Sequence, residues 1–131
     1  MPLELRLLAY SVALLFVLIA VQASASTLAH GLPTMAGNRD ELGPPKPFEG
    51  RTKRALYNHI EGMLMFTPLA LIIVQQGLSN PMTELGARLF FYARVGHAAA
   101  YLIGLPYVRT LIWGVSIVGL AMMFLSLFGI I

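Results

Sequence analysis

Four long apolar segments take up most of this chain, over residues 3–29, 52–76, 81–104 and 107–128. The hydrocarbon core of a bilayer is about 30 Å thick, and an α-helix needs about 20 predominantly apolar residues to cross it. Each of the four segments is long enough for one crossing. The sequence therefore predicts an all-α integral membrane protein, with one domain over residues 1–131 built as a four-helix bundle.

Composition agrees with a membrane protein. Hydrophobic residues make up 57% of the 131 positions, only 11% are charged, and the mean hydropathy is +0.74. These values are too apolar for an ordinary soluble domain of this size. The chain has no cysteine, which excludes disulfides, thiolate metal ligands and a protein thiol nucleophile. Any thiol chemistry must therefore arrive with a substrate.

The ends of the segments carry recognisable start and stop signals. Asn80 can cap the third segment, and Pro81 suits its first helical position. Gly104 and Pro106 leave room for only a tight turn before the fourth segment, so the third and fourth should form an antiparallel hairpin. Residues 30–50 are rich in glycine, proline and charge, which predicts a loop. The small residues at 23–26 also resemble a signal-peptide cleavage site, but we expect a retained helix.

Lys and Arg residues are distributed unevenly between the two sides of the predicted bundle. The side with the long loop and the last turn carries six of them, Arg39, Lys46, Arg51, Lys53, Arg54 and Arg109. The opposite side carries only Arg6 and Arg88. By the positive-inside rule we expect the long loop to be cytoplasmic and both termini to face away from the cytoplasm.

Two segments carry polar side chains along one helical face. The two rows are Arg54, Asn58 and Glu61 in the second segment, and Arg94, His97 and Tyr101 in the third. Their spacings of three and four residues align each row along a helix. An ionisable side chain inside a bilayer costs about 2.5–3.5 kcal/mol on insertion scales and is functional by default. The rows therefore predict a buried polar site near the loop side of the bundle.

Some of these residues also have a purely structural interpretation. Arg54 can extend its side chain to the membrane surface. Glu61 needs a cation, and an ion pair with Arg94 or Arg54 can simply hold the helices together. Tyr101 and Trp113 can belong to an interfacial aromatic belt.

The histidines do not predict a metal site. His97 alone is more often a hydrogen-bonded packing residue than a ligand, and neither His30 nor His59 has metal-ligand spacing with it. We therefore expect no metal.

Arg109 lies in the first turn of the fourth segment, on the side that carries the cationic loop. Several guanidinium groups can converge there, and such groups bind carboxylates with two parallel hydrogen bonds. Anionic lipid headgroups are the alternative ligands for basic residues beside a membrane. Gly96, Ala100 and Gly104 form a ridge of small residues that permits close helix packing.

Two sequence stretches resemble one family. The stretch Gly37-Asn38-Arg39-Asp40-Glu41, followed by Arg51-x-x-Arg54-Ala55-x-x-Asn58-x-x-Glu61 and Phe66, resembles the signature of the MAPEG family, membrane-associated proteins in eicosanoid and glutathione metabolism. Arg94-Val95-Gly96-His97-Ala98-Ala99-Ala100-Tyr101-Leu102, with Arg109 following, is similar to the third helix and the start of the fourth in its microsomal glutathione transferase and prostaglandin E synthase branch. The matches run from about Asn38 to Trp113 in the family's order.

The resemblance implies a homotrimer of four-helix units with glutathione as cosubstrate, bound between neighbouring subunits. In similar enzymes the positions matching Arg54, Asn58, Glu61, His97 and Tyr101 contact glutathione or support residues that do. We expect Arg51, Arg94 and Trp113 to bind it as well. The position of Arg109 lies next to the glutathione sulfur in similar enzymes. A guanidinium there would stabilise the thiolate and lower the thiol pKa from its ordinary value of about 8.5. Thr110 matches a hydroxyl residue that can also approach the sulfur.

The chain departs from the better-known family members at three positions. The first segment does not end in an arginine, Tyr57 replaces a second arginine, and Trp113 replaces a tyrosine. Fewer cationic contacts should weaken the hold on glutathione. The compact chain resembles bacterial members of the family, which would place it in the inner membrane.

Three functions follow, in descending order of preference. The first is a glutathione-dependent transferase or peroxidase that acts on lipophilic electrophiles from the bilayer, with Arg109 and Thr110 as the catalytic residues. The second is a non-catalytic lipid-binding protein of the same family. The third is an ion or proton pathway through Glu61, Arg94 and His97. The expected partners are further copies of the chain, membrane lipids and a lipophilic small molecule, with no nucleic acid.

Overall fold

Long helices run alternately up and down the molecule in the computed structural model, which describes residues 1–40 and 42–131. The elements are α1 (Leu3–His30), α2 (Leu32–Ala36), α3 (Pro47–Gln75), α4 (Pro81–Ile103) and α5 (Pro106–Leu127). The described residues form no strand, so the all-α prediction is confirmed for them. Glu41, part of the quoted family signature, lies outside the described residues.

Three of the long helices are long and apolar enough to cross a membrane, namely α1, α3 and α5. Helix α4 has 23 residues, which corresponds to a length of about 35 Å. Its charged residues Glu84, Arg88 and Arg94 are spread along the helix, whereas α3 has a long uncharged stretch after Glu61. The chain is therefore an integral membrane protein with three clear candidate spans.

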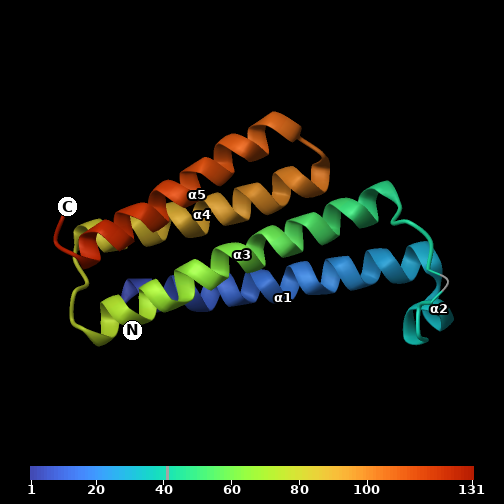
Figure 1. The fold of residues 1–131 in the computed structure, drawn as a ribbon, viewed down its shortest axis with the longest axis horizontal. Helices are drawn as coiled ribbons and strands as arrows, with labels where there is room; N and C mark the ends of the chain where they lie inside the picture. Colours follow the sequence, from blue (N-terminus) through green and yellow to red (C-terminus); the bar gives the residue numbers. More distant parts are fainter. Residues whose placement is uncertain (41) are drawn as a thin grey trace.

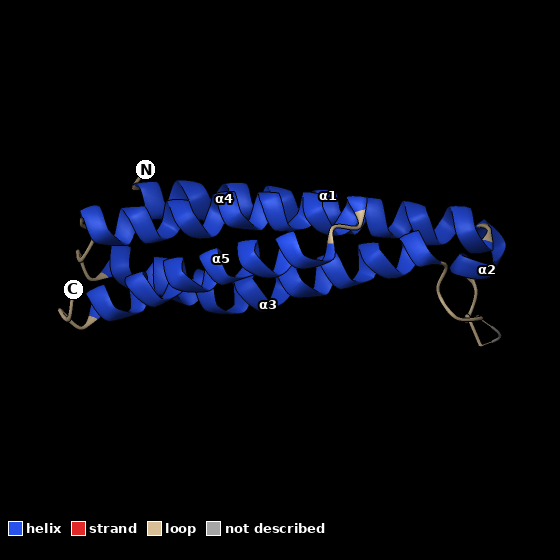
Figure 2. Cartoon of the chain, turned by 90° about the horizontal axis from the view of Figure 1, so that it is seen from above, coloured by secondary structure: helices blue, strands red, loops and turns tan. Residues whose placement is uncertain are grey.

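Helices α3 and α4 lie in the middle of the molecule and contact each other. Helices α1 and α5 each pack against both of them, but they do not contact each other within the described part of the chain. Both termini lie at one end, and α2 and the α4–α5 turn lie toward the other (Figure 1, Figure 2). We call the latter the loop end. The predicted grouping of the long loop with the last turn is therefore present in the fold.

The predicted helix boundaries are accurate where a local cap sets them. The Asn80 side chain accepts hydrogen bonds from the backbone N–H groups of Met82 and Thr83, at 2.8 and 3.0 Å. Helix α4 ends at Gly104, which adopts a φ of 83° that favours glycine. Both signals were predicted from the sequence.

The predicted start of the second long helix was wrong by five residues. Helix α3 begins at Pro47 instead of Thr52, because Pro47 suits the first helical position and the Glu49 carboxylate accepts a hydrogen bond from the Lys46 N–H at 3.1 Å. The predicted loop also contains the short helix α2.

Two apolar clusters fill the space between the helices. The larger one is built around Phe66 of α3 and Phe90 of α4, whose rings stack with centroids 4.3 Å apart. The smaller one lies nearer the loop end and joins Leu18 of α1 to Leu56 of α3 and Ala98 of α4. The core thus holds α3 and α4 together along their length.

Helices α4 and α5 touch closely at two glycines. A Cβ added at Gly119 would lie 2.5 Å from the carbonyl oxygen of Gly86, and one added at Gly86 would lie 2.6 Å from that of Gly119. At Gly96, in the ridge predicted from sequence, an added Cβ would only reach the Ile112 side chain at an ordinary 3.6 Å. The two helices are close beside the C-terminus and spread apart toward their turn (Figure 1).

Candidate functional site

A cavity of about 200 Å³ opens where α4 and α5 spread apart. It is lined by six of the ten residues predicted for the site, which are Asn58 from α3, His97 and Tyr101 from α4, and Arg109, Thr110 and Trp113 from α5. The four other predicted residues, Arg51, Arg54, Glu61 and Arg94, do not line it. Spacing predicted one shared face on α3 and one on α4, and the fold brings Asn58, His97 and Tyr101 from these faces together with three residues of α5.

Tyr101 is the centre of the charged part of this cavity. The guanidinium carbon of Arg109 lies 4.3 Å from the centroid of its ring, and that of Arg54 lies 5.9 Å from the same centroid. Both distances allow cation–π attraction. The His97 ring meets the Tyr101 ring edge-on, with centroids 5.2 Å apart. Two arginines from different helices are thereby held beside one aromatic ring, which gives this region a positive potential.

Two buried polar atoms of the cavity residues have no hydrogen-bond partner among the described residues. They are Oδ1 of Asn58 and Nδ1 of His97. His97 is only 2% exposed. Buried polar atoms are normally paired with protein or water. An unpaired acceptor and an unpaired ring nitrogen at the wall of a cavity are therefore available to a bound polar molecule.

Arg94 lies deeper in the bundle and is 2% exposed. Its Nε and Nη2 have no hydrogen-bond partner in the part of the chain that the structure describes. Gly62 makes room for it, because a Cβ there would lie 3.6 Å from Arg94 Nε and 3.1 Å from the Phe90 ring. A larger residue at position 62 would force these two side chains away from α3.

The expected ion pair of Glu61 is absent from the described chain. No Lys or Arg nitrogen of the described residues lies within 4.0 Å of its carboxylate. The reason is the orientation of α3, which leaves Glu61 exposed at the surface while Arg94 is buried from the side of α4. The pairing prediction was wrong for the single chain.

Comparison with known families decides what kind of protein this is. The MAPEG family model matches residues 7–129, which is nearly the whole chain of 131 residues. The chain belongs to the MAPEG family. Membership supports a membrane protein of glutathione or eicosanoid metabolism, and it confirms the resemblance seen in the sequence. No curated protein and no solved structure matches the chain.

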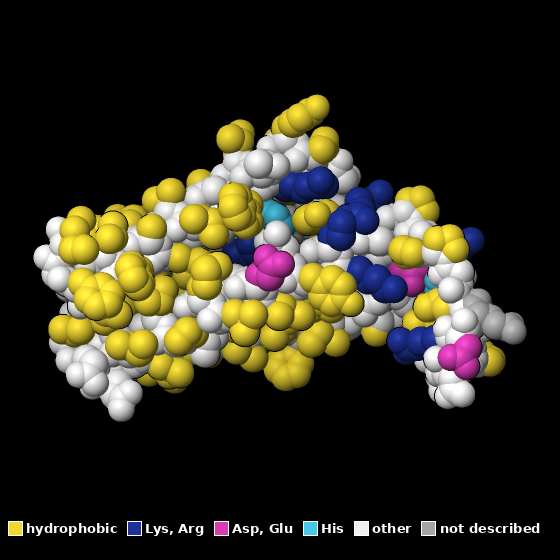
Figure 3. All heavy atoms as spheres, viewed as in Figure 1, with side chains coloured by type: hydrophobic (Ala, Val, Ile, Leu, Met, Phe, Trp, Pro, Cys, Tyr) yellow, Lys and Arg dark blue, Asp and Glu magenta, His cyan; other side chains and the backbone are white. Residues whose placement is uncertain are grey.

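Arg51 of this MAPEG chain lies at the edge of the site. Its guanidinium group lies close to Gly104 at the end of α4, since a Cβ added to that glycine would be 3.8 Å from the guanidinium carbon. The same carbon lies 5.6 Å from the centroid of the Phe48 ring. It therefore stands between the start of α3 and the α4–α5 turn. Together with Arg54 it forms a cationic rim above the cavity, and Figure 3 shows Lys and Arg side chains concentrated in the half of the molecule that carries the loop end.

His59 is a buried polar residue whose structural role the sequence did not reveal. Its residue is 1% exposed, and its Nε2–H donates to the Ser11 carbonyl at 2.9 Å, which ties α3 to α1. The available signal was its spacing, since it lies three residues after Leu56 and four after Ala55 on the buried stripe of α3.

Two buried carboxylates at the helix ends were also missed. Glu49 bonds to Ser26, His30 and the Lys46 backbone at the loop end, an arrangement that we call the Glu49 clasp. Glu4 lies at the other end, where its Oε1 accepts from the hydroxyls of Ser79 and Thr83, both at 2.7 Å. Apart from the Lys46 N–H, their partners come from distant parts of the sequence, so local spacing could not predict these contacts.

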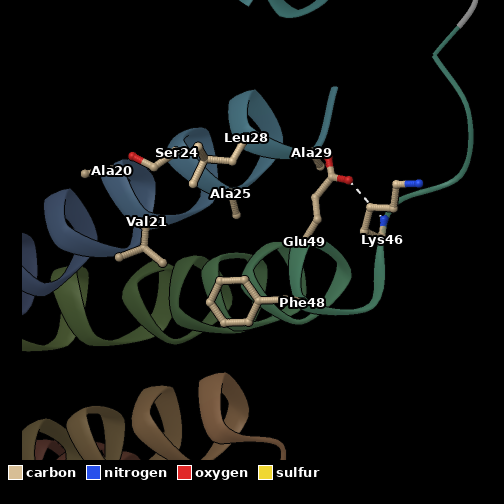
Figure 4. A pocket seen from close by; sticks show the side chains of 9 residues that line it. All are labelled: Ala20, Val21, Ser24, Ala25, Leu28, Ala29, Lys46, Phe48 and Glu49. Carbon is tan, nitrogen blue, oxygen red and sulfur yellow. Dashed lines mark hydrogen bonds between the residues drawn. The ribbon is translucent and has the colours of Figure 1, made fainter. Parts of the chain in front are cut away.

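Two apolar grooves flank α3. One, of about 460 Å³, lies between α3 and α5 and is lined by Leu64, Met65, Pro68, Leu69, Ile117, Leu120, Ala121 and Phe124. The other, of about 510 Å³, lies between the second half of α1 and the start of α3, with Phe48 on its side and Glu49 at its loop end (Figure 4). The α3–α5 groove continues the cavity's own helix faces, because Trp113, Ile117 and Ala121 are spaced by four residues along α5.

No three His, Cys, Asp or Glu side chains of residues 1–40 and 42–131 gather as a metal site would require. The chemistry available to the described cavity is that of guanidinium, hydroxyl, imidazole, amide and aromatic groups.

Proposed function

We propose that this MAPEG protein is a glutathione-dependent membrane transferase or peroxidase that acts on lipophilic electrophiles. The observation that carries the proposal is the cavity in which Arg109 and Thr110 of α5 meet Tyr101 and His97 of α4 and Asn58 of α3. Family membership supports glutathione or eicosanoid metabolism, and the chain has no thiol of its own.

The groups around the cavity fit the chemistry of glutathione. Its two carboxylates need cationic donors, and Arg51 and Arg54 at the rim supply guanidinium groups that match a carboxylate. Its ammonium and amide N–H groups need acceptors, and Asn58 Oδ1 is an acceptor without a partner among the described residues. Glu61 is exposed beside this region and adds an anionic group for the ammonium.

When bound, glutathione supplies a thiol whose deprotonated form is the nucleophile. Arg109 would stabilise that anion, because a guanidinium next to sulfur favours the thiolate. Thr110 would assist by donating its hydroxyl hydrogen. This hydroxyl is free to do so, since its bond to the Pro106 carbonyl is long, at 3.4 Å, and exposed.

The α3–α5 groove is suited to the lipophilic substrate. Its lining residues are aliphatic or aromatic apart from Met65, and it lies along two helices that can cross a membrane. A hydrophobic tail in this groove would bring an electrophilic group toward Trp113 and Thr110 at the cavity. The tail would move from one apolar medium, the bilayer, into another, so packing contacts would hold it in the groove.

The small size of the cavity supports a site that a second copy of the chain completes, as in the homotrimer that the family resemblance implies. Ligand pockets in proteins usually enclose about 300–1,000 Å³, whereas this cavity has about 200 Å³. Arg54 and Glu61 are exposed on the same side, where a second copy of the chain would complete the enclosure. We also propose that α4 is the fourth span and that the loop end is cytoplasmic, in a bacterial inner membrane, because Lys and Arg concentrate there.

Calorimetric titration of glutathione into the detergent-purified protein tests the proposal. We expect saturable binding in the parent, weaker binding in Arg109→Leu and unchanged binding in Arg88→Leu. Arg88 is a suitable control because it is an exposed arginine of α4 outside the cavity, near Glu84. Absence of binding at millimolar glutathione would refute the proposal.

A non-catalytic lipid-binding role is the second candidate, and the α3–α5 groove favours it. The two functions differ in turnover. An enzyme should conjugate glutathione to chlorodinitrobenzene or reduce a fatty-acid hydroperoxide, and Arg109→Leu should abolish this. If a protein that binds glutathione shows no turnover with either electrophile but retains long-chain lipid through purification, the lipid-binding role is preferred.

A further inference from the structure

The Glu49 carboxylate, in the first turn of α3, is buried and fully hydrogen-bonded. Its Oε1 accepts from the Lys46 backbone N–H at 3.1 Å and from His30 Nε2–H at 2.8 Å, and its Oε2 accepts from the Ser26 hydroxyl at 2.7 Å. The Lys53 ammonium lies 3.8 Å from Oε2. Figure 4 shows Glu49 reaching from α3 toward the end of α1, with its bond to Lys46. One side chain thus joins α1, the connecting loop and α3.

A carboxylate satisfies all these partners in their present hydrogen-bonding roles. Ser26, His30 and the Lys46 N–H all act as donors, and they require two oxygens that accept from different sides. An amide of the same shape has one oxygen and one NH₂ group. If its oxygen faced the Lys46 N–H and His30, the NH₂ group would face Ser26, whose hydroxyl would have to turn from donor to acceptor and give up its present bond. If the amide turned the other way, the NH₂ group would face the Lys46 N–H, and a buried donor without an acceptor costs free energy. Glu49→Gln therefore changes the clasp without changing its volume.

The clasp fixes the part of α3 that carries the cationic rim. Arg51 and Arg54 follow Glu49 within the next two turns. Arg51 reaches the end of α4, with its guanidinium carbon 3.8 Å from a Cβ placed at Gly104, and Arg54 approaches the Tyr101 ring at 5.9 Å. A helix whose first turn is free to fray or rotate would move both guanidinium groups relative to α4. Five of the six residues that line the cavity belong to α4 and α5, so the position of the rim relative to them depends on this end of α3.

We propose that Glu49 is a positioning residue for the ligand site, which it serves by clasping the start of α3 to the end of α1 so that Arg51 and Arg54 face the cavity. The role rests on the proposed function, because it assumes that these two arginines hold glutathione. Glu49 itself lies outside the cavity lining and acts only through them. The Ser26 and His30 contacts are part of the same device.

A distance measurement tests the clasp without any ligand. The chain has no cysteine, so spin labels on Tyr57→Cys and Ile103→Cys, both exposed in the structure, report how α3 lies against the end of α4. Glu49→Gln should broaden and shift the label–label distance distribution measured by double electron–electron resonance. Ser26→Ala, which removes one contact, should do the same to a smaller extent and covers the case in which Glu49→Gln does not fold. Glu84→Gln is the control.

Glutathione titration of the same variants tests the consequence for the site. Affinity should fall about tenfold in Glu49→Gln, which is the loss of roughly 1.4 kcal/mol, and less in Ser26→Ala, with Glu84→Gln unchanged. An unaltered distance distribution overturns the positioning role alone, as does an altered distribution with unaltered affinity. If the parent itself binds no glutathione, the proposed function fails instead. The two failures are therefore distinguishable.

Discussion

The contact between Gly86 and Gly119 predicts that a single methyl group on α5 destabilises the protein. In Gly119→Ala the added Cβ would lie 2.5 Å from the Gly86 carbonyl oxygen and 2.9 Å from the Phe90 backbone nitrogen. Carbon–oxygen contacts between helices are normally about 3.3–3.6 Å. Because both nearest atoms belong to the backbone of α4, no side chain can move aside. The two helices must separate by about 1 Å.

The cost of this separation exceeds the benefit of replacing a helical glycine. A gap of up to 1 Å forfeits a quarter to a half of each van der Waals contact, and a buried side chain makes about 50 contacts of roughly 0.15 kcal/mol. If the separation removes a third of the contact energy of one buried side chain, the cost is about 2.5 kcal/mol. Alanine gains about 1 kcal/mol over glycine in a helix. We therefore expect Gly119→Ala to lower the free energy of unfolding by about 1.5 kcal/mol, within the range for overpacked cores.

Gly114→Ala on the same helix is the matched control, because a Cβ there would meet no atom within 4 Å. It should leave the protein as stable as the parent or slightly more stable. Unfolding in mixed micelles, titrated with a denaturing detergent, can be followed through Trp113, the only tryptophan of the chain. Equal midpoints for the two variants would refute the close crossing of α4 and α5.

Three further substitutions test other parts of the molecule. Asn80→Ala removes the cap of α4 and should lower the free energy of unfolding by about 1 kcal/mol in the same titration, whereas Asn38→Ala in the loop should not. Arg94→Met replaces a buried cation by an apolar side chain, and should raise the free energy of unfolding by about 1 kcal/mol while weakening glutathione binding in calorimetry. A lower free energy of unfolding would contradict our finding that Arg94 Nε and Nη2 have no partner among the described residues. Ala121→Leu fills the α3–α5 groove and should lower kcat/KM for a long-chain hydroperoxide about tenfold, with glutathione affinity unchanged. An equal loss of kcat/KM for chlorodinitrobenzene, which has no long tail, would argue against the groove as the site of the tail.

The helices could be predicted from sequence because their determinants are local. Apolar length sets the spans, and Asn80 and Gly104 mark the limits of α4 within a few residues of the groups they satisfy. The start of α3 was missed because Pro47 and Glu49, its local start signals, lie in the stretch interpreted as a loop. The contacts that bury Glu49, by contrast, are not local. Ser26 lies 23 residues away in the sequence and His30 lies 19 away. No local pattern records such contacts.

The candidate site was predictable as sets of residues but not as an arrangement. Spacing identified the rows that contain Asn58 and His97, and the fold brings both to one cavity. It could not give the rotation of each helix about its own axis. Asn58 is half-buried, yet Glu61, three residues later in the same row, is exposed. The rotation of α3 about its own axis therefore decides whether the Glu61 carboxylate meets Arg94 or faces away from it.

The cavity follows from a gradient of side-chain size along the α4–α5 hairpin. Near the C-terminus, Gly86 and Gly119 let the two backbones touch. Toward the turn, large side chains such as Tyr101 and Arg109 lie between the helices, with 4.3 Å between the guanidinium carbon and the ring centroid, and they hold the helices apart. A methyl group at the contact between Gly86 and Gly119 would push α4 and α5 apart there, and would thereby change the distance between the two helices at the cavity. Stability and site geometry are therefore coupled through one helix pair, so Gly119→Ala should change the environment of Trp113 in the folded protein as well as the midpoint of unfolding.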